Sequence, residues 1–282
     1  MGVIIGLVIV VSSVVGGYLM GHGVMSILWQ PAELVIIFGA ALGVFVITSS
    51  GEMMKGVVHS LKAMLSAKQY GEKEYMELLQ VLNSMFNVVR KQGLVALEAH
   101  LDKPAKSPVF SKYKSFLNNE HALLLTTDSF RMIVSSKMEA HELDALMEAE
   151  IDGYHEEMMS SAHNLSNIGD SLPGLGIVAA VLGIVITMQS INEPPEVLGH
   201  HIGTALVGTF LGILGAYGFV GPVAKKLGWM ADQEKEYLNI LRYITVAFVG
   251  GLQPQICLEF GRMLIPEPAR PTFLKTEKFL KN

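Results

Sequence analysis

Residues 172–191 read LPGLGIVAAVLGIVITMQSI, twenty consecutive residues without a charged side chain. A helix needs roughly 20 apolar residues to cross the hydrocarbon core of a bilayer, so this run predicts a membrane span. Three further uncharged runs have the same character: residues 2–20, 34–48 and 202–224. The second is short, with Ala32 and Glu33 at its edge, and would need support from neighbouring spans. We therefore predict four membrane-spanning helices.

The first of these runs has a rival interpretation. An apolar segment at the start of a chain is also typical of a cleavable signal peptide, but no basic segment stands before residues 2–20. The absence of that segment favours a membrane span.

The cationic residues orient the spans. Of the 21 lysines and arginines, twelve lie between Lys55 and Lys137 and nine between Lys225 and Lys281. A cation at the bilayer centre costs roughly 2.5–3.5 kcal/mol on insertion scales, and cytoplasmic loops keep the lysines and arginines. Both blocks are therefore predicted to be cytoplasmic, as are both termini. The two links without Lys or Arg, residues 21–31 and 192–200, face the other side, and the prolines of the second predict a non-helical turn.

Composition excludes several classes of function. The chain is 50% apolar and 17% charged, whereas soluble domains carry about a quarter charged residues. A net charge of −5 provides no basic surface for nucleic acid. The single cysteine, Cys257, rules out an internal disulfide and a multi-cysteine zinc site. No nucleophile motif, phosphate loop or catalytic dyad is found, so we expect neither an enzyme nor a bound cofactor.

The chain is predicted to be an all-α membrane protein with a helical cytoplasmic domain between its second and third spans. The expected parts are residues 1–49 with spans one and two, 50–168 with the cytoplasmic domain, 169–225 with spans three and four, and 226–282 with a cytoplasmic C-terminal helix and tail. The apolar stretch from Tyr243 to Leu252 is too short to cross a bilayer, so it is interpreted as a packing helix or an interfacial segment.

Two charges in the cytoplasmic domain stand out. Arg90 lies at the end of a predicted helix that Gly93 terminates, and Glu98 follows on a short segment over residues 94–101. We expect the two to project from neighbouring positions of a helical hairpin. By chemistry alone, a solvated surface pair worth under about 1 kcal/mol is the favoured interpretation. The acidic residues Glu148 and Asp152 are interpreted as part of a charged helix surface rather than a metal site.

Small residues predict where the spans meet. Gly176 and Ala180, and likewise Gly208 and Gly212, are four residues apart, a spacing that lets helix backbones approach closely. Spans three and four should therefore be the inner ones, and spans one and two should face lipid more.

Prolines and hydroxyls also mark the third and fourth spans. Pro173 and Pro222 lie near the cytoplasmic boundary, where each is either a hinge or a simple helix terminus. Thr187, Thr204 and Thr209 lie within the spans and can be satisfied by their own helix carbonyls. No titratable side chain is expected inside a span, so a proton-carrying carboxylate would have to come from a partner helix.

These runs resemble the MotA family of flagellar stator subunits, part of the MotA/ExbB/TolQ proton-channel superfamily. Residues 169–183, GDSLPGLGIVAAVLG, resemble the third span of the family, and residues 207–219, VGTFLGILGAYGF, resemble the fourth. Further agreement comes from Arg90, Glu98 and the tail motifs EFGR at 259–262 and RPTF at 270–273. The resemblance covers essentially the whole chain, including two spans, a cytoplasmic insert and two more spans.

The resemblance implies an assembly in the bacterial inner membrane. Five such chains would surround two copies of MotB, and an aspartate on the MotB helix would supply the missing carboxylate. Its protonation and release would convert proton-motive force into rotation of the ring. Arg90 and Glu98 would meet the rotor protein FliG, with Glu150 a weaker candidate for the same surface.

The resemblance also implies roles inside the membrane. Thr209 and Thr187 would line the ion path, and Pro173, Pro222 and Tyr217 would transmit the protonation change to the cytoplasmic domain.

Ala180 bears on the choice of ion. Sodium-driven relatives carry a threonine where Ala180 stands, and a dehydrated sodium ion needs hard oxygen ligands that a methyl group lacks. Protons are therefore favoured.

Two other functions stay open. An ExbB- or TolQ-like subunit would energise outer-membrane processes with the same ion chemistry, but those chains have three spans and lack the paired first two. A passive membrane scaffold that only holds a partner would give no ion flux.

Overall fold

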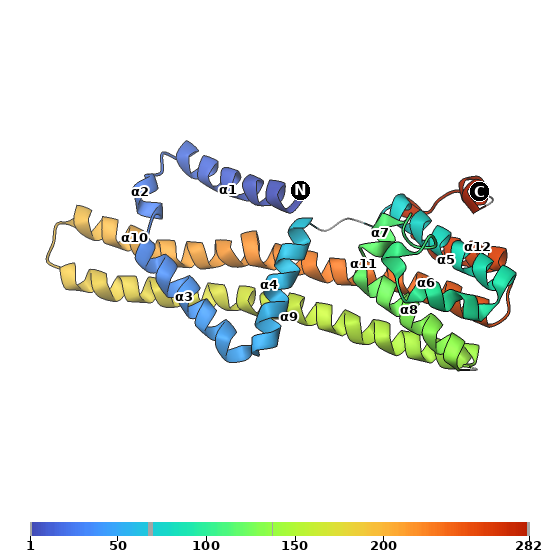
Figure 1. Cartoon of the computed structure of the whole chain (residues 1–282). Coiled ribbons are helices and arrows are strands. Elements are labelled where there is room, and N and C mark those ends of the chain that lie inside the picture. Colours follow the sequence, from blue (N-terminus) through green and yellow to red (C-terminus); the bar gives the residue numbers. More distant parts are fainter. Residues whose placement is uncertain (1, 67–69, 137, 281–282) are drawn as a thin grey trace. The chain divides into compact units, whose positions relative to one another are not determined.

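The computed structural model describes residues 2–66, 70–136 and 138–280, and within these ranges it contains helices and no strand (Figure 1). Four helical stretches are long and apolar enough to cross a membrane: Gly2–Met20, Met25–Thr48, Ala140–Ser190 and Pro195–Val249. The prediction of an all-helical chain with four spans is confirmed.

The chain folds into two compact units, each built from two separate segments. The first unit comprises Met1–Ala67 with Glu157–Met230, and the second comprises Lys68–Glu156 with Ala231–Asn282.

The first unit holds the apolar helices. Its elements are α1 (Gly2–Met20), α2 (Met25–Leu28), α3 (Pro31–Thr48), α4 (Gly51–Ser66), the later part of α9 (Ala140–Thr187), η3 (Met188–Ser190), α10 (Pro195–Leu214), the π-helical η4 (Gly215–Val220) and the start of α11 (Gly221–Val249). Figure 1 shows α9 and α10 running antiparallel on either side of a short turn.

The backbones of α9 and α10 approach closely at glycines. A Cβ atom placed on Gly176 would lie 2.8 Å from the carbonyl oxygen of Gly208, and one on Gly212 would lie 2.6 Å from the carbonyl oxygen of Leu172. Only residues without a side chain allow this contact, as the spacing of small residues predicts. By contrast, α1 has no buried residue, so its surface is left for lipid or for other chains; the more lipid-facing position of the first span stays a prediction.

The prolines near the third and fourth spans differ in their surroundings. Residues 192–194 form a non-helical turn, as the prolines predict, but residues 196–200 are helical because α10 begins at Pro195, whose missing N–H would be unpaired at a helix start anyway. Of the two alternatives for Pro173, a helix terminus is excluded, since α9 continues through it from Ala140 to Thr187. Pro222 follows the π-helical segment η4 directly.

The second unit has a larger apolar core. Its elements are α5 (Glu72–Gln92), η1 (Leu94–Leu97), α6 (Glu98–Leu101), η2 (Pro104–Lys106), α7 (Lys114–Leu117), α8 (Glu120–Ser135), the early part of α9, the later part of α11, α12 (Pro254–Leu264), η5 (Glu267–Ala269) and α13 (Phe273–Leu280). The apolar end of α11 belongs to this core, where Phe248 stacks on Phe86 with ring centroids 3.9 Å apart. The stretch beginning at Tyr243 is therefore a packing helix.

Ion pairs join α9 to α11 within the second unit. Arg242, whose side chain is only 6% exposed, contacts Asp144 at 2.6 Å and Glu148 at 3.2 Å. One turn further along α9, Lys235 lies 2.8 Å from Asp152. Cations on α11 therefore neutralise these three acidic residues of α9. The sequence predicted a solvated charged surface here, whereas the structure shows ion pairs between two helices.

Candidate functional site

The loop between α5 and α6 presents Arg90 and Glu98. Gly93 ends α5 with a φ of +86°, a left-handed conformation that favours glycine, and η1 then leads directly into α6. Arg90 is in the last turn of α5, and Glu98 is the first residue of α6. Both side chains are exposed, so the helical hairpin expected from the sequence is present and its charges face outward.

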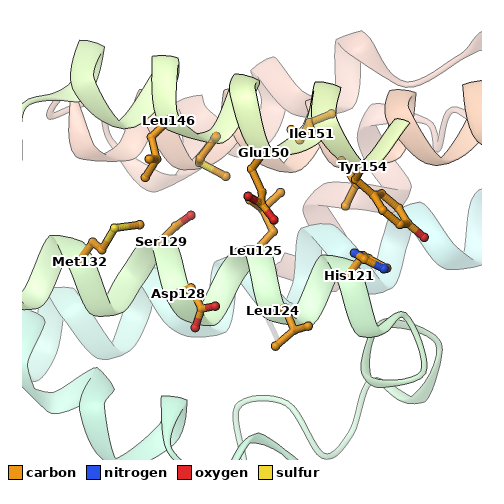
Figure 2. A pocket seen from close by; sticks show the side chains of 12 residues that line it. His121, Leu124, Leu125, Asp128, Ser129, Met132, Leu146, Glu150, Ile151 and Tyr154 are labelled. Carbon is orange, nitrogen blue, oxygen red and sulfur yellow. The ribbon is translucent and has the colours of Figure 1, made fainter. Parts of the chain in front are cut away.

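Glu150 lines a pocket between α8 and α9 of about 250 Å³ (Figure 2). Figure 2 shows its carboxylate reaching from α9 toward Leu125 on α8. At one end of the pocket the rings of His121 and Tyr154 stack with centroids 3.4 Å apart. The buried part of the lining combines the apolar side chains of Leu125, Met147 and Ile151 with the hydroxyl-bearing Ser129.

The three charges predicted to meet a rotor lie on three different elements of the second unit. Among the residues that the structure describes, none of Arg90, Glu98 and Glu150 forms an ion pair within the chain. Their charges are thus available to another protein, while most neighbouring charges on α9 are already neutralised by α11.

The hydroxyls and Ala180 have individual environments in the first unit. The hydroxyl of Thr187 is buried and donates to the carbonyl oxygen of Gly183 at 2.8 Å, within its own helix. Thr209 is half-buried, and its Cα lies 3.3 Å from a Cβ placed on Gly176. Ala180 is 7% exposed, and its methyl group offers no oxygen ligand. Their roles in an ion path stay predictions.

The residues predicted to couple the membrane part to the cytoplasmic part lie on helices that do not break. Pro173 is half-buried inside α9, and Pro222 is exposed next to η4. Tyr217 lies within η4 and is 72% exposed. Segments of π-helix are rare and are found frequently at functional sites, so η4 marks the part of the fourth span where the helix geometry is least regular.

The expectation that no titratable side chain lies inside a span is wrong. Glu33 is the third residue of α3, which starts at Pro31 rather than at Leu34, and its side chain is 8% exposed. Within the described residues its Oε2 atom has no hydrogen-bond partner. The sequence held a signal for this: a proline at the first helical position followed by an acidic residue in the first turn is typical of a helix start.

Comparisons with known proteins agree with this arrangement. The family model described as motility protein A N-terminal matches residues 4–93, and the MotA/TolQ/ExbB proton channel family model matches residues 116–239. Motility protein A of Salmonella typhimurium is 36% identical over 279 residues, covering 99% of this chain and 95% of the relative. Chemotaxis protein LafT of Vibrio parahaemolyticus is 32% identical over 98% of this chain and 97% of its own length.

The chain belongs to the motility protein A family.

Solved structures share the fold. The MotAB structure from C. jejuni superposes with a TM-score of 0.79 at 19% identity, covering 96% of this chain and 98% of that chain. The flagellar MotAB stator complex from Bacillus subtilis gives a TM-score of 0.77 at 23% identity, covering 93% of this chain and 95% of that chain.

Membership of the motility protein A family accounts for the features of the fold. The N-terminal family model, matched over residues 4–93, covers both of the first two candidate spans. The chain is a multi-pass membrane protein that matches a proton channel family, and it is not an enzyme.

Proposed function

We propose that this chain assembles with a MotB-type partner in the bacterial inner membrane, with both of its own termini in the cytoplasm. Five copies would surround two copies of the partner, whose aspartate would carry the proton. The observation that carries this proposal is the 36% identity to motility protein A along essentially the whole chain. The two blocks of lysine and arginine support the orientation, because such residues stay on the cytoplasmic side.

The exposed surfaces support contact with further chains. Ile177, Val181 and Ile184 on α9 are 56%, 53% and 42% exposed, so one apolar face of this helix is uncovered within the chain. Lipid or neighbouring helices must cover such a face in a membrane.

Ion flux tests the channel. Co-expression of this chain with the candidate MotB-type partner should give a proton conductance that neither polypeptide gives alone. Replacement of sodium by choline should leave the conductance unchanged, because Ala180 offers no oxygen ligand. A complex that assembles without conducting protons would support the passive scaffold instead.

Charge reversal tests the rotor contact. We propose that Arg90, Glu98 and Glu150 meet charged residues of the rotor protein FliG. Arg90→Glu and Glu98→Lys should each weaken torque at least twofold with assembly intact, because both side chains are exposed and unpaired within the described chain. Swimming speed and tethered-cell torque measure the effect.

A matched control comes from the same helix. Lys73 is exposed near the start of α5, so Lys73→Glu makes the same change of charge away from the hairpin. It should leave torque unchanged, and all these surface changes should alter stability by less than about 0.5 kcal/mol. Unchanged motility in the single and double reversals of Arg90 and Glu98 would remove the rotor-contact proposal.

A further inference from the structure

The carboxyl group of Glu33 lies in a space that glycines leave open. A Cβ atom placed on Gly208 of α10 would stand 2.5 Å from Oε2 of Glu33, and one on Gly183 of α9 would stand 3.3 Å from Oε1. The side chain is 8% exposed, and Oε2 is buried without a hydrogen-bond partner among the described residues. Three helices thus enclose a carboxyl group whose acceptor oxygen is unsatisfied.

This carboxyl group lies well inside the apolar part of the first unit. Gly208 follows Pro195, the first residue of α10, by thirteen residues, which places it about 20 Å along the helix axis. Gly183 precedes Ser190, the last residue of η3, by seven residues, or about 10 Å. Glu33 therefore faces the bodies of α9 and α10 and not the turn that joins them.

Among the residues that the structure describes, α2, α9, α10 and η4 carry no lysine or arginine that could neutralise an ionised Glu33. The titratable groups on α10 are Glu196, His200 and His201, and His201 shares the face of Gly208 at about 10 Å along the axis. The membrane part of α9 has Asp170 near its start, η4 has the exposed Tyr217, and α2 has no titratable residue. An unpaired buried carboxylate costs far more free energy than the neutral acid in the same place.

We propose that Glu33 is a proton-binding site of this chain, with the proton held on a carboxyl group enclosed by α3, α9 and α10. The neutral acid fits the glycine-lined space of the structure. Release of the proton would leave a bare charge against Gly183 and Gly208, so ionisation must bring in water or shift α3 on α10. The site would thereby link protonation to helix packing.

Within the channel proposed above, this site would add a carboxyl group on this chain to the one that the partner supplies. That role rests on the proposed function, but binding of the proton does not. Sodium is a poorer fit, because the carboxyl group offers only two oxygens.

Infrared spectroscopy of the full chain in lipid nanodiscs tests the site. At neutral pH the wild type should show the C=O stretching band of a protonated carboxylic acid, shifted by exchange into deuterium oxide. Glu33→Gln should lose this band. Glu196→Gln, which changes an exposed glutamate on α10, should retain it. Absence of the band from the wild type, or its persistence in Glu33→Gln, would overturn the inference.

A second variant and a change of cation complete the experiment. If Glu33→Gln does not fold, Glu33→Asp keeps a carboxyl group and must shift the band in frequency; an unshifted band would argue against Glu33. Replacement of choline by sodium should leave the wild-type band intact, and its loss would identify a sodium site instead.

Proton conductance and the infrared band test the channel and the Glu33 site separately. A wild-type complex that conducts no protons but shows the band would refute the channel and leave the Glu33 site. A conducting complex without the band would do the reverse.

Discussion

At the scale of single residues, a polar network ties the start of α5 to α8 and α11 in the second unit. Tyr70 donates a hydrogen bond to the carboxylate of Glu234, and Asn119 donates both to Glu234 at 2.9 Å and to the Tyr70 hydroxyl at 2.7 Å. Asn119 also caps α8 by accepting a bond from the backbone N–H of Ala122 at 2.9 Å. Each member of the network is positioned by the others, so removal of one leaves its partners unsatisfied.

Replacement of Tyr70 tests this network. Tyr70→Phe removes the hydroxyl that Glu234 and Asn119 share, and should lower the free energy of unfolding by about 1–2 kcal/mol. Cys257 provides the measurement, because it is the only cysteine and is fully buried in the same unit. A loss of about 1.4 kcal/mol should speed thiol labelling by about tenfold. Tyr243→Phe, at an exposed position, should label like the wild type.

The buried tyrosines predict a dependence on alkaline pH. Burial raises the pKa of both Tyr70 and Tyr75, and the negative charge of Glu234 adds to the effect at Tyr70. A pKa raised in the folded state stabilises the fold below the unfolded value and loses that contribution as pH rises. The thermal midpoint should therefore fall above the ordinary tyrosine pKa of 10.0, and fall less steeply in Tyr70→Phe. Identical pH profiles for the two proteins would contradict this assignment.

At the scale of elements, the contact between α9 and α10 depends on backbone against backbone. A Cβ atom on Gly212 would meet the carbonyl oxygen of Leu172 at 2.6 Å and the Cα of Gly176 at 2.9 Å. Neither atom belongs to a flexible side chain, so the two helices would have to separate. Gly203 lies on the same helix with no atom within 4 Å of such a Cβ.

The two glycines make a matched pair. Gly212→Ala should destabilise the chain by about 1–3 kcal/mol and reduce motility, because the α9–α10 contact cannot close. Gly203→Ala should be neutral or slightly stabilising, because alanine favours helix more than glycine does. Thermal unfolding in detergent and swimming assays measure both, and equal stability of the two variants would count against the close contact.

At the scale of the whole molecule, the second unit is completed only by the end of the chain. Leu258 and Ile265 are fully buried in its core, and α12 packs so closely that a Cβ on Gly261 would meet the side chain of Ile244. Burial of each such side chain stabilises by roughly 1.5–3 kcal/mol, against about 5–15 kcal/mol for a typical domain. The C-terminal segment is therefore a part of the fold rather than an appended tail.

Two truncations separate these roles. A chain that ends at Leu252 loses α12 and η5 and should leave the second unit unfolded, with Cys257 and its neighbours gone and the protein degraded in cells. A chain that ends at Thr272 keeps α12 and η5 and loses α13, with its exposed Lys275–Glu72 pair and the buried Thr276, so it should accumulate far better than the shorter chain. Protein levels in membranes measure both, and equal accumulation would refute a structural role for α12.

Hydropathy and the distribution of lysine and arginine were enough to predict four spans. The hydrocarbon core of a bilayer requires a long run of apolar residues and excludes cationic side chains, and both features can be read directly from the sequence. The helical hairpin of Arg90 and Glu98 followed from local chemistry as well, since Gly93 ends α5 by its own backbone conformation. These properties depend on neighbours along the chain.

Contacts between distant residues needed the folded structure. The enclosure of Glu33 by Gly183 and Gly208, the neutralisation of the acidic face of α9 by Arg242, and the part that α12 plays in the core all join segments far apart in sequence. The continuity of α9 through Pro173 belongs with them, because packing supports a helix that local propensity would break. A linear pattern reports the preference of each segment, whereas three-dimensional packing settles which side chains become neighbours.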